Sequence, residues 1–227
     1  INQINRLDII SNNLANANTT GFKQVGVSEG TFNNYLRKAE ENNSLINKES
    51  LVSNTVPKLD QQYISSAVGP IETTGNALDF ALQGKETFFK VQKEDGEIMY
   101  TRDGSFKTSN NSFLVDSNGN HVLNNDNEPI TTEGNFISLI AVVKTKFENL
   151  DKFGDNYYRD KDEKQIEQLE DNEGYLIQGA VEKSNVNTVS TMIGLIEANK
   201  NFAQYQKAIS GVDEMNRKLI EKLGRMV

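Results

Sequence analysis

Carboxylates are the most numerous side chains in this sequence that could do chemistry, with 32 Asp and Glu against 24 Lys and Arg. One polar run gathers several of them around Lys161 and Lys164, namely Asp160, Asp162, Glu163, Glu167, Glu170 and Asp171. Paired carboxylates can serve as general acid and base, and groups of them can bind divalent cations. Runs of mixed charge are usually solvated, so we interpret this one as an exposed face or loop.

Two turns rich in Asn and Asp come closest to a calcium loop. One runs from Asp116 to Asn120 (DSNGN) and the other from Asn124 to Glu128 (NNDNE). A calcium loop needs alternating oxygen ligands, a central Gly and a terminal Glu, and neither turn completes that pattern. We therefore predict no metal site in this chain.

The sequence holds a single histidine and no cysteine. His121 ends the turn-like stretch NGNH, where we expect a surface residue. With one such histidine a Ser–His–Asp triad is implausible, and without cysteine there are no disulfides, cysteine-ligated metals or thiol catalysis. Gly-rich phosphate loops are missing as well. The sequence therefore predicts a protein that is not an enzyme and that needs no cofactor.

The overall composition indicates which classes of binding partner fit this chain poorly. A net charge of -8 makes nucleic acid a poor partner, because its phosphates carry the same sign. No run reaches the roughly 18 apolar residues that a membrane helix needs, so we expect no membrane insertion, and no secretory signal peptide is visible. With 227 residues of which 36% are hydrophobic, the chain can bury a modest core in one large domain or two small ones.

The elements that would position any site begin with an N-terminal helix. Leu7, Ile10, Leu14 and Ala17 recur at helical spacing, and Thr19-Thr20-Gly21 then stops the helix within residues 1–24. Residues 25–66 are polar and predict an extended linker, in which Phe32, Tyr35 and Leu36 could form a short helix.

Residues 67–183 show the pattern of short strands and turns that indicates a small all-β module. Phe88 to Val91 and Ile98 to Thr101 flank the turn Glu94-Asp95-Gly96, which predicts a hairpin. Phe136 to Val143 is an apolar run of strand length, and a short strand is expected between Gly174 and Gly179.

Residues 184–227 predict one long helix, which Ser184 or Asn185 can cap. Apolar residues recur there at alternating spacings of three and four, and only Asn216 is polar in this seam: Leu195, Ala198, Phe202, Tyr205, Ile209, Val212, Asn216, Leu219, Leu223 and Met226. A second row, Val189, Met192, Ile193 and Ile196, is expected to widen the apolar face at the helix start. The helix packs either on its own domain or on helices of other chains, and periodicity alone leaves both open.

Several motifs resemble the flagellar axial family, which comprises rod, hook and hook-junction subunits. Residues 7–23 (LDIISNNLANANTTGFK) are similar to its N-terminal signature, and residues 181–187 (VEKSNVN) to its C-terminal one. Residues 78–84 (LDFALQG), 88–91 (FFKV) and 100–106 (YTRDGSF) resemble its β module, and residues 153–157 (FGDNY) its next segment. The motifs occur in family order, although the family normally has more residues between Pro129 and Phe136.

The resemblance implies an α+β fold in which the N- and C-terminal helices pair in a coiled-coil-like core and a small all-β module projects from it. It implies a structural subunit of the bacterial flagellar basal-body rod in the periplasm, which assembles helically with copies of itself and with adjacent rod or hook subunits to transmit torque. It also implies unfolded passage through the flagellar export apparatus without a cleaved signal peptide.

Shortness and residues 209–214 (ISGVDE) favour the proximal rod type, with the distal type as the alternative. A hook-family protein or rod-associated binding module, or a wall-cutting enzyme fused to a rod signature, are weaker hypotheses. The apolar residues of both helices and the Asn residues of the signature turn are predicted to form the subunit interface: Leu7, Ile10, Asn12, Asn13, Leu14, Asn16, Asn18, Phe202, Tyr205, Ile209, Val212, Leu219 and Leu223.

Overall fold

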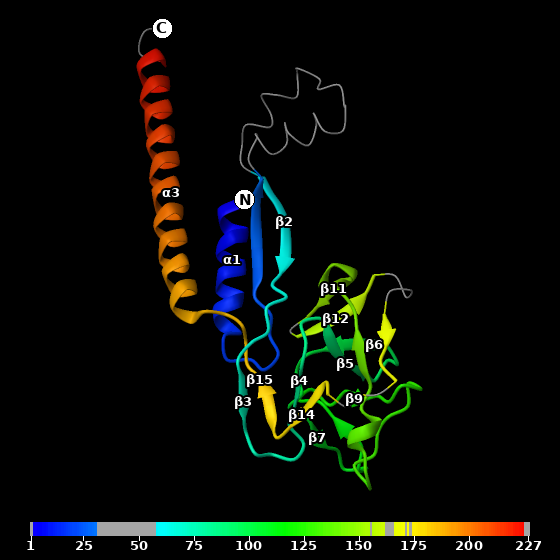
Figure 1. Ribbon diagram of the computed structural model, residues 1–227. Helices are drawn as coiled ribbons and strands as arrows, with labels where there is room; N and C mark the ends of the chain where they lie inside the picture. Colours follow the sequence, from blue (N-terminus) through cyan, green and yellow to red (C-terminus); the bar gives the residue numbers. More distant parts are fainter. Residues whose placement is uncertain are drawn as a thin grey trace, which may run out of the picture. The chain divides into compact units, whose positions relative to one another are not determined.

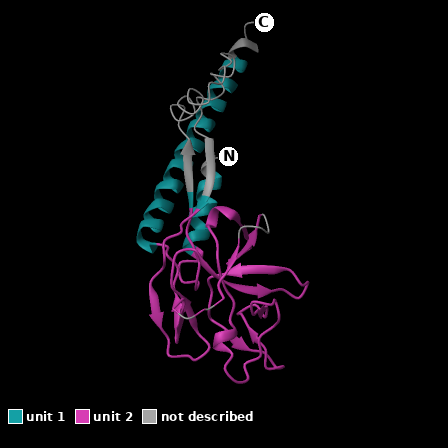
Figure 2. Cartoon of the chain, turned by 45° about the vertical axis from the view of Figure 1, so that its right-hand side comes forward, with its two compact units in different colours: residues 1–14, 26–63, 187–227 teal, residues 15–25, 64–186 magenta. Residues whose placement is uncertain are grey.

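Figure 1 shows the computed structural model of the chain, which describes residues 2–30, 58–154, 156–161, 166–170, 172 and 174–224. The chain divides into two compact units, coloured separately in Figure 2. Unit 1 comprises Ile1–Leu14, Gly26–Tyr63 and Asn187–Val227, and unit 2 comprises Ala15–Val25 and Ile64–Val186. The helices fall in unit 1 and most strands in unit 2, which confirms the predicted α+β class. The short helix proposed around Phe32 lies outside the described residues.

Unit 1 contains helix α1 (Asn2–Ala15), the two-stranded sheet of β1 (Val25–Gly30) and β2 (Lys58–Ile64), and helix α3 (Thr188–Gly224). Helix α1 ends earlier than the sequence suggested, because the chain turns at Asn16, whose carbonyl accepts the N–H of Thr19 (3.2 Å) and whose amide oxygen accepts the Thr19 hydroxyl (3.1 Å). Asn competes with the helical backbone in this way and so favours helix ends and turns.

Helix α3 begins at Thr188, later than either predicted cap. Asn187 is the capping residue, since its side-chain oxygen accepts the N–H of Ser190 (3.0 Å). Ser184 and Asn185 bond elsewhere: the Ser184 hydroxyl accepts the N–H of Val186, and the Asn185 side chain bonds to other segments of unit 2. The predicted long helix is present, and its cap is shifted by two or three residues.

Unit 2 is built from short strands. Its largest sheet has nine strands in the order β11-β12-β6-β5-β9-β8-β7, with β10 pairing β5 and β13 beside that path. The strands of this sheet are β5 (Thr87–Gln92), β6 (Ile98–Thr101), β7 (Lys107–Thr108), β8 (Leu114–Val115), β9 (His121–Val122), β10 (Val142–Lys144), β11 (Leu150–Phe153), β12 (Tyr157–Asp160) and β13 (Glu167–Gln168).

Two smaller antiparallel pairs complete unit 2. One joins β3 (Ile71–Thr73) to β15 (Ala180–Glu182), and the other joins β4 (Phe80–Leu82) to β14 (Leu176–Gln178). Both pairs bring residues near 70–82 together with residues near 176–182, so each of these two-stranded sheets joins strands separated by about half the chain. The predicted strand between Gly174 and Gly179 is confirmed as β14.

The predicted hairpin is also confirmed. Strands β5 and β6 pair antiparallel, with Gln92 opposite Ile98. The turn between them places Gly96 at φ +86, and the Asp95 carboxylate accepts the N–H of Glu97 (3.0 Å). Gly adopts this left-handed conformation without a steric cost, which explains the Asp-Gly signal.

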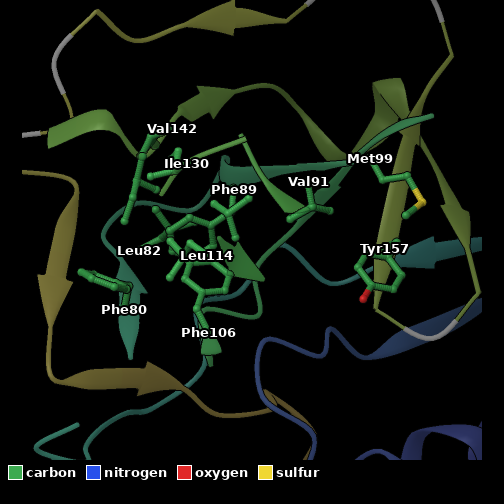
Figure 3. Close-up of a cluster of buried hydrophobic side chains, with 12 residues drawn as sticks. Phe80, Leu82, Phe89, Val91, Met99, Phe106, Leu114, Ile130, Val142 and Tyr157 are labelled. Carbon is green, nitrogen blue, oxygen red and sulfur yellow. The ribbon is translucent and has the colours of Figure 1, made fainter. Parts of the chain in front are cut away.

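The core of unit 2 lies on both faces of β5, because successive side chains of a strand point to opposite faces. Phe89 and Val91 join the cluster drawn in Figure 3, whereas Phe88 belongs to a second cluster with Tyr158. The apolar run from Phe136 to Val143 is not one strand, as predicted. It begins with a 3₁₀ turn, η2 (Ile137–Leu139), and strand β10 starts only at Val142. A second 3₁₀ turn, η3 (Phe147–Asn149), precedes β11.

Candidate functional site

The predicted interface residues of α3 form an exposed apolar surface, which we call the α3 seam: Phe202, Tyr205, Ile209, Val212 and Leu219. Phe202 is half-buried, whereas Tyr205, Ile209, Val212 and Leu219 are 56%, 63%, 50% and 59% exposed. The side chain of Leu223 lies outside the described residues. Side chains of this size rarely stay exposed in a row on one helix unless another surface covers them.

The predicted residues of α1 and its turn have mixed surroundings. Leu7, Ile10 and Leu14 are half-buried, and Asn13 is buried. In the signature turn, Asn16 is half-buried, and Asn12 and Asn18 are exposed. The helices of unit 1 approach at Gly194, where a Cβ would lie 3.9 Å from Cδ1 of Ile10. Pairing of α1 along the α3 seam remains a prediction for the assembled protein.

A second apolar surface lies at the start of α3. Val189, Met192, Ile193 and Ile196 are 50–68% exposed, whereas Thr191 and Ala198 are buried. Successive residues turn by about 100° around a helix, which places this row nearly opposite the α3 seam rather than beside it. The row therefore does not widen the seam, as the sequence suggested, but gives α3 two apolar faces.

Unit 2 contains a buried charged cluster that the sequence did not single out. The carboxylate of Glu182 accepts hydrogen bonds from Lys23 Nζ (2.6 Å), Arg102 Nε (2.7 Å) and the backbone N–H of Gly69 (2.8 Å). All three charged side chains are fully buried. Burial and the neighbouring Arg102 cation lower the pKa of Lys23 from its ordinary value, and the Glu182 carboxylate opposes that shift.

Arg102 connects this cluster to the β sheet. Its guanidinium also donates to the carbonyls of Thr87 (2.7 Å) and Leu82 (3.3 Å), which belong to β5 and β4. A rigid, planar donor group suits a buried site where several acceptors must be met at once.

Further hydrogen bonds hold the same three stretches of chain together, and we call residues 21–24, 65–70 and 182–185 the joint. The N–H of Gly21 donates to the Glu182 carbonyl (2.7 Å) and the N–H of Gln24 donates to the Asn185 side chain (2.7 Å). That Asn185 side chain also donates to the Ala67 carbonyl (2.9 Å), and Lys23 Nζ donates to the same carbonyl (2.7 Å). Lys23 and Glu182 lie in the motifs TTGFK and VEKSNVN, but nothing in either motif marks the two charges as partners.

The turns that resembled calcium loops have another role in the structure. Asp116 accepts the N–H groups of Asn118 and Asn120 (both 2.9 Å), and the hydroxyl of Tyr157 donates to it (2.6 Å). Its oxygens thus already serve as acceptors inside the turn. Among the described residues no group of three His, Asp or Glu side chains is placed to hold a metal ion, and no helix is long and apolar enough to cross a membrane.

Comparison with protein-family models places three matches along the chain. Residues 1–23 match the model described as flagella basal body rod protein, residues 81–143 match the flagellar hook protein FlgE/F/G D1 domain, and residues 177–222 match the flagellar basal body rod FlgEFG protein C-terminal region. These ranges include the N-terminal signature, part of the predicted β module, and the C-terminal signature with most of its helix.

Individual relatives match nearly the whole chain. The flagellar basal-body rod protein FlgG of Buchnera aphidicola subsp. Acyrthosiphon pisum is 33% identical over 254 residues, covering 96% of this chain and 93% of the relative. The flagellar basal-body rod protein FlgF of Caulobacter vibrioides is 30% identical over 238 residues, covering 97% and 92%. The predicted resemblance is confirmed: the chain belongs to the family of flagellar basal-body rod proteins, as a structural protein and not an enzyme.

Proposed function

We propose that this chain builds the flagellar rod by helical assembly with copies of itself and with adjacent rod or hook subunits, so that the assembled shaft transmits torque. The observation that carries the assembly proposal is the α3 seam, whose Ile209, Val212 and Leu219 are half-exposed or more in the single chain. Burying each large apolar side chain contributes about 1.5–3 kcal/mol, so repeated contacts between copies would make a stiff assembly.

The lengths of the two helices support contacts between chains. Helix α3 has 37 residues and α1 has 14, which correspond to about 56 Å and about 21 Å at ~1.5 Å per residue. One α1 therefore cannot cover one α3. We propose that α1 and α3 pair in a coiled-coil-like core whose remaining contacts come from neighbouring copies.

The second apolar face of α3 fits the same proposal. A helix with apolar residues on one side needs one partner, whereas Val189, Met192, Ile193 and Ile196 lie nearly opposite the seam. A helix inside a multi-chain shaft is contacted from more than one side. We propose that this row contacts a different copy from the one that covers the α3 seam.

The proposed place of the protein is the periplasmic rod, reached unfolded through the flagellar export apparatus without a cleaved signal peptide. The relatives named as basal-body rod proteins support this placement. For the rod type we propose the proximal one, with the distal type as the alternative. Relatives of both names match this chain at similar identity, 33% for the FlgG protein of Buchnera aphidicola and 30% for the FlgF protein of Caulobacter vibrioides. The sequence feature that favours the proximal type is the stretch of residues 209–214 (ISGVDE) in the last helix.

The assembly proposal is tested by placing a charge in the α3 seam. Ile209→Asp or Val212→Asp would bury an unpaired carboxylate at each contact between copies, which costs several kcal/mol per site. We expect cells carrying either variant to lose motility and rods, while the purified protein keeps the circular-dichroism signal of a folded unit 2.

Ser210→Asp is the matched control, because it adds the same charge at the neighbouring position but about 100° away around the helix. It should leave motility close to normal. Normal motility of cells that carry Ile209→Asp or Val212→Asp would refute the assembly proposal.

A further inference from the structure

The chain passes between its two units after residues 14, 25, 63 and 186. Three of these passages, those after 25, 63 and 186, lie within a few residues of the joint formed by residues 21–24, 65–70 and 182–185. All three stretches of the joint belong to unit 2, so their mutual hydrogen bonds hold the ends of the chain segments that enter and leave this unit.

We infer that Glu182 is the positioning residue of this joint, which fastens the segment after α1, the segment after β2 and the segment before α3 to one another. Glu182 is itself in the third segment. Its carbonyl accepts the N–H of Gly21 and its carboxylate accepts from Lys23 Nζ, both in the first segment. The carboxylate also accepts the N–H of Gly69 in the second segment. The same carboxylate also accepts from Arg102 Nε, so one side chain joins the three stretches to Arg102.

The cluster has more positive than negative charges, so removing different charges should have different effects, and this makes the inference testable. Two cations, Lys23 and Arg102, face one carboxylate, and all three are fully buried. Removing the Glu182 charge leaves both cations buried without a counter-charge, and such unpaired charges are strongly destabilising. Removing the Lys23 charge leaves the neutral pair of Arg102 and Glu182 in place.

Arg102 and Lys23 have different structural roles, because their other hydrogen-bond partners differ. Arg102 is bonded to the carbonyls of Leu82 and Thr87 in β4 and β5, so it anchors Glu182 to the sheet. Lys23 is bonded to the carbonyl of Ala67, so it ties the segment after α1 to the segment after β2. Losing Lys23 should therefore loosen the segments after α1 and after β2 but not the segment before α3, whereas losing the Glu182 charge should loosen all three.

The purpose of the joint rests on the proposed function. Under the proposed function, the terminal helices contact neighbouring copies, and any torque reaches unit 2 through the chain segments that enter it at the joint. A fastened joint would share the load among three chain passages instead of leaving it to each backbone separately.

Amide hydrogen exchange of the full-length purified chain, resolved by mass spectrometry, tests the joint directly. In Glu182→Gln we expect exchange to rise at least about a hundredfold in residues 21–24, 65–70 and 182–185, while the amides of β5 change by less than about threefold. In Lys23→Met we expect a rise of about tenfold confined to residues 21–24 and 65–70. An equal rise in β5 and the joint, or no rise in the joint, would overturn the inference.

Asp116→Asn is the matched control, because Asp116 is another buried carboxylate of unit 2 that accepts several hydrogen bonds. It should loosen residues 114–120 and leave the joint unchanged. Should Glu182→Gln fail to fold, Lys23→Met decides the matter: a selective rise supports the joint and an unchanged joint overturns it. Because this measurement uses the unassembled chain, its failure is distinct from normal motility in Ile209→Asp, which would refute the assembly proposal instead.

Discussion

Several buried polar side chains of unit 2 are bonded to partners from distant parts of the chain, and this pairing limits which residues can replace them. Burying an ionised group costs several kcal/mol unless close counter-charges and hydrogen bonds compensate. Asp116 meets the hydroxyl of Tyr157, and Glu182 meets Lys23 and Arg102. Tyr158 is different: it is fully buried, yet its hydroxyl has no hydrogen-bond partner among the described residues.

Adjacent Tyr157 and Tyr158 should therefore respond differently to loss of the hydroxyl. The Tyr157 oxygen donates to Asp116 and accepts from the side chains of Asn118 and Asn120, so Tyr157→Phe should destabilise unit 2 by about 1–3 kcal/mol. Tyr158→Phe removes an unpaired buried polar atom and should be neutral or slightly stabilising. Urea unfolding at neutral pH measures both, and an equal loss in the two variants would refute the distinction.

The same two tyrosines predict a loss of stability in alkali. Burial raises the pKa of both above the ordinary value of 10.0, and for Tyr157 the hydrogen bond to Asp116 adds to the shift. Above about pH 10 the unfolded chain releases these protons while the folded chain keeps them, so the free energy of unfolding falls as pH rises. In Tyr158→Phe the fall should be less steep than in the wild type, as followed by unfolding at several pH values. Parallel curves would contradict this prediction.

At the scale of elements, the start of α3 depends on one capping side chain. Asn187 accepts the N–H of Ser190, which would otherwise lack an intrahelical partner. Asn187→Ala should destabilise the first turn by about 1 kcal/mol and raise amide exchange around Thr191 about fivefold. Asn187→Asp keeps the acceptor and places a negative charge at the positive end of the helix dipole, so it should retain protection. Equal protection in the Ala and Asp variants would show that the cap is not used.

The sequence predicted those elements whose signal is local. The hairpin of β5 and β6 was predicted from Asp95-Gly96 and the two apolar runs beside it. Helix α3 was predicted from apolar residues that recur at alternating spacings of three and four over many turns. The prediction of a single strand from Phe136 to Val143 was wrong, because an apolar stretch is compatible with several conformations. Here a 3₁₀ turn precedes the strand. Hydrophobicity alone does not determine that choice.

The joint could not be predicted because its partners are far apart along the chain. Lys23 and Glu182 are separated by 159 residues, and Arg102 and Glu182 by 80. Their motifs were recognised as family segments, but spacing gave no reason to bring the three charges together. The interface prediction has the opposite character: the α3 seam followed from local periodicity, and its partners in other copies are a proposal.

At the scale of the whole molecule, two opposing forces act between copies. The exposed α3 seam favours association, whereas a net charge of -8 on every chain opposes it. Salt weakens the repulsion, since the Debye length falls from about 30 Å at 0.01 M to about 8 Å at 0.15 M, and it does not weaken apolar contacts. Self-association should therefore increase with ionic strength.

Sedimentation velocity at a fixed protein concentration tests this balance. The wild-type chain should shift from mostly monomer toward larger species as sodium chloride rises from about 0.01 M to about 0.15 M, because screening lets the seams of different copies meet. Ser210→Asp should follow the wild type with a small delay from its added charge, whereas Ile209→Asp should stay monomeric throughout. If salt instead dissociated the wild-type chain, contacts between copies would be ionic rather than apolar, and the α3 seam would lose its assigned role.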